Sequence, residues 1–294
     1  MIDLHMHSDV SDGSLAPEAL AAQVAQCGLT AAALTDHDTT AGAVRFVDAC
    51  GKLGVRGIAG VEISADFAPG TMHVLGYFPA VPQGEFERQL GRIREGRSDR
   101  NARILETLRG LGMPLDPQAL EAFSGGGVAG RPHIAQAMTA RGYVPDGRAA
   151  FDLYLAKGKP AYHDRFRLGP QESVAAICAA GGAAVLAHPF TLKLTTEALR
   201  FMLEALAEAG LSGVEVIYPE HPEPLRQLYT TLALERGLAV VGGSDFHGAL
   251  NPAIQLGRGF GNVRVPEKAL EDLETRSGLF FGSRGDGATT GVAR

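Results

Sequence analysis

Histidines and carboxylates stand at the ends of short apolar runs along this chain, and this repeated placement constrains the fold most strongly. His5 and His7 close the first apolar run, and Asp36-His37-Asp38 closes the second. Residues i and i+2 of a strand point to the same side, so the first two imidazoles can reach one ion. Similar side chains lie at the end or near the start of later runs, or in the first loop: Asp12, Glu62, His73, His188, Asp245 and His247.

The apolar runs alternate with amphipathic stretches over most of the chain. Strands are expected at 2–6, 30–35, 55–64, 72–78, 183–187, 213–218 and 238–242. Helices are expected at 17–27, 40–53, 172–180, 196–209 and 224–236. Repeated strand–helix units predict an α/β fold with a parallel sheet covered by helices, either a barrel or an open doubly wound sheet.

The pattern changes in the middle of the chain, where no strand-like run appears. Three helices are expected there, at 85–109, 131–141 and 148–156. We therefore predict a helical insertion at 85–165, placed over the substrate, within a discontinuous barrel domain at 1–84 and 166–282. The Gly-, Thr- and Ser-rich segment 283–294 is expected to be a flexible tail.

The bulk properties exclude several classes of protein. With 294 residues and 45% hydrophobic residues, the chain can bury one large core, and its net charge of −6 provides no basic field for long duplex nucleic acid. No signal peptide and no apolar run of membrane-spanning length is visible, so we expect no membrane association. An odd number of widely spaced cysteines fits buried free thiols in a reducing cytoplasm: Cys27, Cys50 and Cys178.

The placement of the histidines and acids predicts a metal centre. In a parallel barrel the carboxyl ends of the strands surround one mouth, so residues distant in sequence converge there. Imidazole nitrogen with carboxylate oxygen suits Mn²⁺, Zn²⁺ or Fe²⁺. Nine candidates exceed the needs of one ion, so we expect two or three divalent ions, Mn²⁺ first and Zn²⁺ or Fe²⁺ as alternatives. Glu62 can bridge a pair of them.

Each candidate also has an ordinary structural interpretation. His73 alone would be a satisfied core histidine, Asp12 in Ser11-Asp12-Gly13 a turn residue, and Asp36 and Asp38 helix caps or loop starts. These interpretations fail together, because chance does not place a histidine or acid at nearly every strand end, and a core tolerates few unpaired polar groups.

Together the motifs resemble the polymerase-and-histidinol-phosphatase (PHP) family. The matching segments cover nearly the whole chain outside the tail: Asp3-Leu4-His5-Met6-His7-Ser8, Ser11-Asp12-Gly13, Leu34-Thr35-Asp36-His37-Asp38, Gly60-Val61-Glu62, His73, Ala187-His188-Pro189 and Gly243-Ser244-Asp245-Phe246-His247. The resemblance implies a distorted seven-stranded (β/α)7 barrel and a site of two or three metals that hydrolyses phosphate esters.

The resemblance also implies how the ligands are shared among the ions. The first ion would take His5, His7, Glu62 and Asp245. The second would take Glu62, His73 and His188. The third group, which would hold an ion or contact the substrate phosphate and protonate the leaving group, is Asp12, His37 and His247.

Two motifs in the predicted insertion resemble one branch of the PHP family in particular. Gly130-Arg131-Pro132-His133-Ile134-Ala135 and Gly158-Lys159-Pro160-Ala161-Tyr162 resemble the branch with bacterial 3′,5′-nucleoside bisphosphate phosphatases and enzymes that trim short RNA from the 5′ end. Arg131, Lys159 and, more weakly, His133 would then bind substrate phosphate. The alternative is that both cations are ordinary surface residues near helix ends.

The expected activity is release of the 3′-phosphate from a nucleoside 3′,5′-bisphosphate such as pAp, giving AMP, by attack of a metal-bridging hydroxide. Three alternatives stay open: a 5′-3′ exonuclease on short 5′-phosphorylated RNA, a histidinol-phosphate phosphatase, and a non-catalytic PHP domain that partners a polymerase. The helical insertion offers Arg and Lys, which disfavour a small cationic substrate such as histidinol phosphate. The full set of candidate ligands disfavours a non-catalytic domain.

Overall fold

The computed structural model describes residues 1–118, 120 and 129–281. Seven strands form one sheet in sequence order: β1 (Ile2–Asp3), β2 (Ala31–Leu34), β3 (Arg56–Ala65), β4 (Met72–Phe78), β5 (Ala183–Leu186), β6 (Leu211–Ile217) and β7 (Ala239–Gly242). All seven lie where the apolar runs predict them, although β1 is shorter than expected. The predicted tail, 283–294, lies outside the described residues.

One strand breaks the expected parallel arrangement. β4 is antiparallel to both of its neighbours, β3 and β5, whereas the other neighbouring pairs are parallel. The expectation of a parallel sheet is therefore wrong at β4. Residues 66–71 are too short a connection for the crossover that a parallel pair requires. Because β4 runs in the opposite direction, its beginning, with His73, lies at the mouth where the parallel strands end.

Contacts between the segments that follow β1 and β7 nearly close the sheet into a barrel. The Leu4 amide donates to the Gly242 carbonyl at 3.3 Å, and the Asp245 amide donates to the His5 carbonyl at 2.8 Å. The backbones approach so closely that a Cβ built at Gly243 would lie 2.3 Å from the Cβ of His5. Glycine at position 243 is therefore a condition of closure, and the expected seven-stranded barrel is confirmed.

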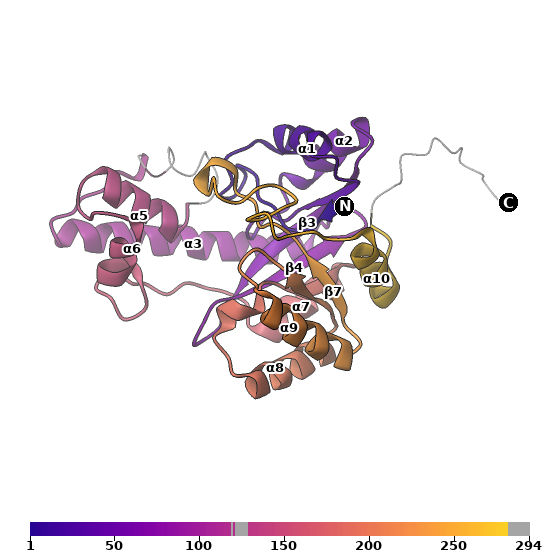
Figure 1. The fold of residues 1–294 in the computed structure, drawn as a ribbon. Helices are drawn as coiled ribbons and strands as arrows, with labels where there is room; N and C mark the ends of the chain where they lie inside the picture. Colours follow the sequence, from indigo (N-terminus) through magenta and orange to yellow (C-terminus); the bar gives the residue numbers. More distant parts are fainter. Residues whose placement is uncertain (119, 121–128, 282–294) are drawn as a thin grey trace.

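Six helices cover the barrel (Figure 1): α1 (Pro17–Gln26), α2 (Ala43–Lys52), α7 (Pro170–Ala179), α8 (Thr196–Glu208), α9 (Glu223–Glu235) and α10 (Glu267–Ser277). Local sequence explains their ends: Pro17 occupies the first turn of α1, and Gly28 follows it with φ 70°. The sequence did not predict α10, whose buried residues are Ala269, Leu270 and Leu273 among mostly charged neighbours.

Alternate strand residues face two different layers of the core. Ala183 and Val185 belong to the cluster inside the barrel, which also contains Ile2 and Leu4. Ala184 and Leu186 belong to the cluster between the sheet and the outer helices. The strands are therefore buried on both faces, as is usual for a mainly parallel sheet covered by helices.

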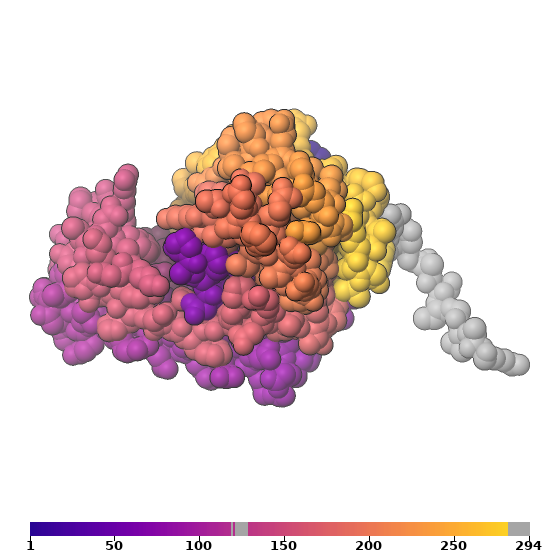
Figure 2. Space-filling view, turned by 90° about the horizontal axis from the view of Figure 1, so that it is seen from below, coloured from indigo at the N-terminus to yellow at the C-terminus, as the bar shows by residue number. Residues whose placement is uncertain are grey.

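The helical segment in the middle of the chain has a hydrophobic cluster of its own. The segment consists of α3 (Glu85–Gly110), α5 (Arg131–Ala140), α6 (Gly147–Ala150) and a π-helical turn (Phe151–Leu155). Phe86 at the start of α3 packs on the barrel, whereas Ile104 near its end packs with α5. Figure 2 shows the segment as a lobe set off from the barrel by an indentation. These observations support our proposal of an insertion at 85–165. Among the helices that the structure describes, none is both long and apolar enough to cross a membrane.

Replacing Gly243 with Ala should destabilise the fold, because the added methyl overlaps the backbone of His5. We expect a loss of about 1–3 kcal/mol in the free energy of unfolding, measured by urea denaturation. The matched control is Gly91→Ala in α3, where the nearest atom to a new Cβ is 3.9 Å away. That variant should gain about 0.5–1 kcal/mol, since alanine favours a helix interior. Equal stability of the two variants would contradict the role of Gly243 in closure.

Candidate metal centre

The nine candidate ligands converge at one mouth of the barrel, and the segments at the ends of six strands supply them. Each is placed by the end of an apolar strand or by the loop that follows it. β1 is followed by His5, His7 and Asp12, and β2 by His37. β3 carries Glu62, β4 carries His73 near its beginning, and β5 is followed by His188. β7 is followed by Asp245 and His247.

Glu62 lies at the centre of this group. Its side chain is 1% exposed, and both of its oxygens face imidazole nitrogens. Oε2 lies 3.3 Å, 3.2 Å and 3.1 Å from ring nitrogens of His5, His7 and His37, respectively. Oε1 lies 2.7 Å and 3.0 Å from ring nitrogens of His73 and His188. One buried carboxylate therefore contacts five imidazoles from four strand ends, as a bridging ligand would.

Asp245 completes the first expected ligand set. Its Oδ1 lies 3.3 Å from His5 Nε2 and 3.1 Å from His7 Nε2. Potential ligand atoms of His5, His7, Glu62 and Asp245 all lie within 4.8 Å of one another. The arrangement places two imidazoles and two carboxylates around one small volume.

Two further groups surround the first. Glu62, His37 and His73 also have ligand atoms within 4.8 Å of one another. His188, expected in the second set, contacts the same Glu62 oxygen as His73 but lies outside that triplet, whereas His37 lies inside it. The residues of the second expected set therefore gather around Glu62. His37 lies beside them as a further candidate ligand.

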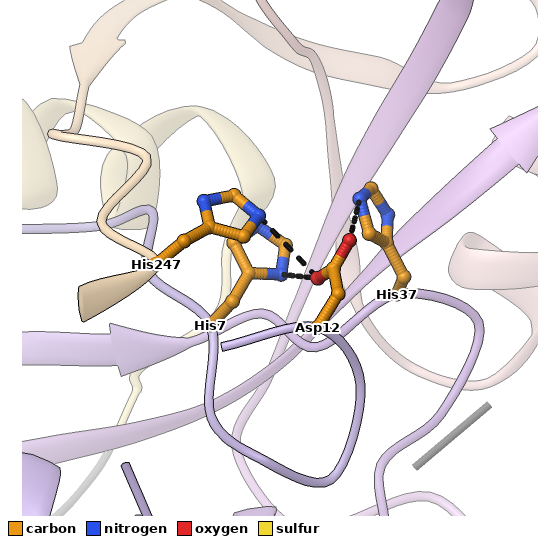
Figure 3. A group of neighbouring side chains, drawn as sticks. All are labelled: His7, Asp12, His37 and His247. Carbon is orange, nitrogen blue, oxygen red and sulfur yellow. Dashed lines mark ion pairs between the residues drawn. The ribbon is translucent and has the colours of Figure 1, made fainter. Parts of the chain in front are cut away.

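The third group surrounds Asp12. In Figure 3 its carboxylate points between three imidazoles, with one oxygen toward His247 and His7 and the other toward His37. The Asp12 Oδ1 to His247 Nε2 distance is 3.3 Å, and the Asp12 Oδ2 to His37 Nε2 distance is 3.6 Å. The expected third set is therefore assembled, and His7 joins it.

The buried polar atoms of the site fit divalent cations. Five of them have no hydrogen-bond partner within the described part of the chain: His5 Nε2, both ring nitrogens of His7, His37 Nδ1 and Asp245 Oδ1. Buried nitrogen and oxygen atoms rarely stay unpaired, because their desolvation is then uncompensated. A mixed imidazole and carboxylate donor set is what Mn²⁺, Fe²⁺ and Zn²⁺ take in proteins.

The pKa values of two neighbouring imidazoles in the site are shifted in opposite directions. Burial alone lowers an imidazole pKa, but the adjacent carboxylates of Asp245 and Glu62 outweigh it at His7 and raise the pKa of that ring to about 10. At His37 burial dominates over the charges of Glu62 and Asp12, and it lowers the pKa to about 4. His37 is therefore neutral near pH 7 and offers a ring lone pair to a cation.

Asp36 holds the loop that carries Asp12. Although Asp36 follows β2, its buried carboxylate belongs to none of the three ligand groups and accepts hydrogen bonds from the Ser8 amide at 2.8 Å and the Ser11 hydroxyl at 2.7 Å. The sequence suggested only a cap or loop role. The structure shows that this carboxylate fixes the path of residues 8–12.

A cavity of about 540 Å³ leads from the metal group to the helical insertion. Asp12, His37 and His73 line one end of it. Seven cationic side chains also line it: Arg97, Arg100, Arg131, Lys157, Arg165, Arg167 and Lys193. A chain with a net charge of −6 therefore has a strongly positive cavity next to its candidate metal ligands.

Three of these arginines are paired with acids. Arg97 and Arg165 both contact the buried carboxylate of Asp38, whose pKa falls to about 2 because the two guanidinium charges outweigh burial. Arg167 lies 2.7 Å from Asp66. These pairs fix the position of the cationic wall.

Arg100 is different, because no carboxylate of the described residues pairs with it. It is 4% exposed, and among the described residues its side chain donates only to the Asn101 side-chain oxygen, at 2.9 Å. Burial and the nearby charges of Arg97 and Arg165 lower its pKa to about 8. An anion in the cavity would relieve this unfavourable position. Sequence reasoning missed Arg100, since it lies within a long run of charged helix residues.

The three residues expected to bind substrate have different positions. Arg131 lines the cavity, where its guanidinium donates to the Leu155 carbonyl at 3.3 Å. Lys159 is exposed and does not line the cavity, whereas Lys157 does. His133 is buried, and its Nδ1 accepts a hydrogen bond from the Gly130 amide at 2.9 Å, which caps α5. The cavity therefore favours Arg131 over the other two.

Comparison with known proteins agrees with this geometry. A family model described as the PHP domain matches residues 3–168. A 3′,5′-nucleoside bisphosphate phosphatase from Chromobacterium violaceum is 32% identical over 84% of this chain and 87% of its own length. A 5′-3′ exoribonuclease from Escherichia coli is 31% identical over 87% of this chain and 88% of its own.

A solved structure shows the same architecture. A candidate metal-dependent phosphoesterase from Bifidobacterium adolescentis superposes with a TM-score of 0.81 at 30% identity, covering 94% of this chain and 96% of the other. The family model, the relatives and the solved structure thus agree on the PHP family, and the solved structure shares the barrel architecture. The chain belongs to the PHP domain family of metal-dependent phosphoesterases.

Proposed function

We propose that this protein releases a phosphate from a nucleoside 3′,5′-bisphosphate, with adenosine 3′,5′-bisphosphate as the model substrate and AMP as the product. The observation that carries the proposal is the cavity that has candidate metal ligands at one end and Arg100 and Arg131 within its wall. A substrate with two phosphates can place one at each of these positions. The relative from Chromobacterium violaceum carries the name of this activity.

Arginine suits the second phosphate for geometric reasons. Its planar guanidinium can donate two parallel hydrogen bonds to phosphate oxygens. Phe151 and Tyr162 also line the cavity, and Arg131 lies 5.9 Å and 5.7 Å from their ring centroids. These aromatic rings provide apolar surface for a nucleoside between the two phosphates.

In this proposal, residues of the chain have two roles at the reacting phosphate: they bind metal ions and they supply a proton. Nine ligands would hold two or three divalent ions: His5, His7, Asp12, His37, Glu62, His73, His188, Asp245 and His247. What bound ions supply is an activated water near neutral pH and neutralisation of phosphoryl charge. Where only two ions bind and the third group holds none, the Asp12–His247 pair, with 3.3 Å between Oδ1 and Nε2, would hold the proton that the departing alkoxide takes.

The second candidate is exonuclease activity on short 5′-phosphorylated RNA. The observation that favours it is the combination of cations and aromatic rings along one cavity, which also suits a short single strand. The relative from Escherichia coli carries the name of this activity. A histidinol-phosphate substrate is disfavoured, because its cationic end would face seven positive side chains.

The substrate proposal is tested by measuring the release of phosphate and of mononucleotides with Mn²⁺ from three compounds: adenosine 3′,5′-bisphosphate, a 5′-phosphorylated RNA oligomer and histidinol phosphate. We expect the highest kcat/KM with the bisphosphate, because it alone places a compact second phosphate in the cationic cavity. Mononucleotides released mainly from the oligomer would instead support the exonuclease. Release from none of the three by the metal-loaded protein would overturn the substrate assignment.

Replacing Arg100 with Met should weaken recognition of the second phosphate. We expect kcat/KM for adenosine 3′,5′-bisphosphate to fall about 10- to 100-fold, because a hydrogen bond to a charged group contributes roughly 1.5–3 kcal/mol. The value for adenosine 3′-monophosphate should change little. Arg109→Met on the same helix is the control, since Arg109 is exposed and pairs only with Glu106 among the described residues. Equal losses on both substrates would contradict a second-phosphate role.

Replacing Glu62 with Gln should remove bound metal and turnover together. The carboxylate contacts imidazoles on both of its oxygens, and an amide nitrogen cannot serve as a metal ligand on one of those sides. Metal content after dialysis, measured by plasma emission spectrometry, and phosphate release are the two measurements. A variant that keeps wild-type metal content and activity would refute the bridging assignment.

A further inference from the structure

Among the seven strands that the structure describes, β6 alone has no candidate metal ligand at its end, yet one polar residue within it and one directly after it contact ligand residues. Glu215 lies inside β6 and is fully buried. Tyr218 follows directly after the strand. An ionised carboxylate in such a position is unfavourable unless specific partners compensate its desolvation. Its partners therefore indicate why the residue is there.

Glu215 contacts residues that follow two different strands, β1 and β5. Its Oε1 lies 2.9 Å from His5 Nδ1, and its Oε2 accepts a hydrogen bond from the His188 amide at 2.9 Å. Within the described residues, His5 is its sole ion-pair partner. The carboxylate thus joins the end of β1 to the end of β5.

The contact with His5 determines which nitrogen of that ring is free. A carboxylate accepts hydrogen bonds, so the His5 proton lies on Nδ1 beside Glu215. Nε2 then presents its lone pair toward Glu62 and Asp245, each 3.3 Å away. This ring orientation is the one that a metal ligand needs.

The contact with His188 holds an unfavourable backbone conformation. His188 has φ 23°, a region that residues other than glycine rarely adopt. The hydrogen bond from its amide to Glu215 offsets this strain and directs the ring toward Glu62, 3.0 Å from Oε1. Without the carboxylate, the buried amide would lose its acceptor.

Tyr218 acts on the remaining side of the ligand group. Its hydroxyl donates to Asp245 Oδ2 at 2.9 Å. The other oxygen, Oδ1, is then left to face His5 and His7 at 3.3 Å and 3.1 Å. Glu215 within β6 and Tyr218 directly after it therefore orient two imidazole ligands and one carboxylate ligand.

We propose that Glu215 and Tyr218 are positioning residues that hold His5, His188 and Asp245 ready to bind metal. The inference rests on the metal centre of the proposed function, but it is independent of the substrate. Partners of this kind, behind the ligands, typically change metal affinity 10- to 100-fold. Glu215 should show an effect of this size, and Tyr218, which supplies one neutral hydrogen bond, a smaller one.

The experiment measures Zn²⁺ affinity of the metal-free protein by competition with a chromophoric chelator. Glu215→Gln keeps the size of the side chain but replaces one acceptor oxygen with a donor. Tyr218→Phe removes only the hydroxyl. Glu208→Gln, at the exposed end of α8, makes the same chemical change away from the site and should match the wild type. Thermal unfolding of each metal-free variant separates loss of affinity from loss of fold.

We expect zinc affinity to fall about 10- to 100-fold in Glu215→Gln and severalfold in Tyr218→Phe, with metal-free unfolding temperatures close to the control. In the zinc-loaded wild type, nitrogen-resolved NMR should show a slowly exchanging Nδ1 proton on His5, which Glu215→Gln shifts or loses.

Wild-type affinity in both variants would overturn the inference and leave the metal centre intact. If Glu215→Gln fails to fold, unchanged affinity in Tyr218→Phe overturns it. A wild-type protein that binds no zinc would overturn the metal centre itself, and the inference with it.

Discussion

The structure depends on one buried carboxylate, Glu62, which contacts five imidazoles from four strand ends. Such a cluster is unfavourable in a protein interior unless cations and fixed partners compensate it. The fold supplies those partners from the layer behind the ligands. Asp36 holds the loop that carries Asp12, and Glu215 holds the rings at the ends of β1 and β5. The barrel is thus the means by which many polar groups share one mouth.

Barrel closure and site geometry share the same residues. The segment after β1 carries His5, and it is also the segment that pairs with the segment after β7. Gly243 permits this close approach, and two residues later Asp245 turns its carboxylate toward His5. Asp245 itself has φ 53°, so the chain turns sharply where the ligand is needed. A change that opened the barrel would separate these ligands.

Much of the fold and of the candidate site could be predicted from the sequence, because both depend on local patterns. Apolar runs marked the seven strands, and polar residues at their ends marked the ligands. The direction of β4 could have been inferred from its short connection to β3, but the alternating pattern suggested a parallel strand. Glu215 and Arg100 were not found, because their roles come from neighbours distant in sequence. An acid within the apolar run of β6 was the one available signal for Glu215.

The continuity of α3 has a consequence for the choice of substrate. Its 26 residues form one unbroken helix, and Arg97 and Arg100 lie between a half that packs on the barrel and a half that packs in the insertion. A helix rises about 1.5 Å per residue and changes little in length. The separation between the metal ligands and these arginines is therefore set by the helix itself. Under the proposed function, the cavity would therefore select substrates by the distance between their two anionic groups.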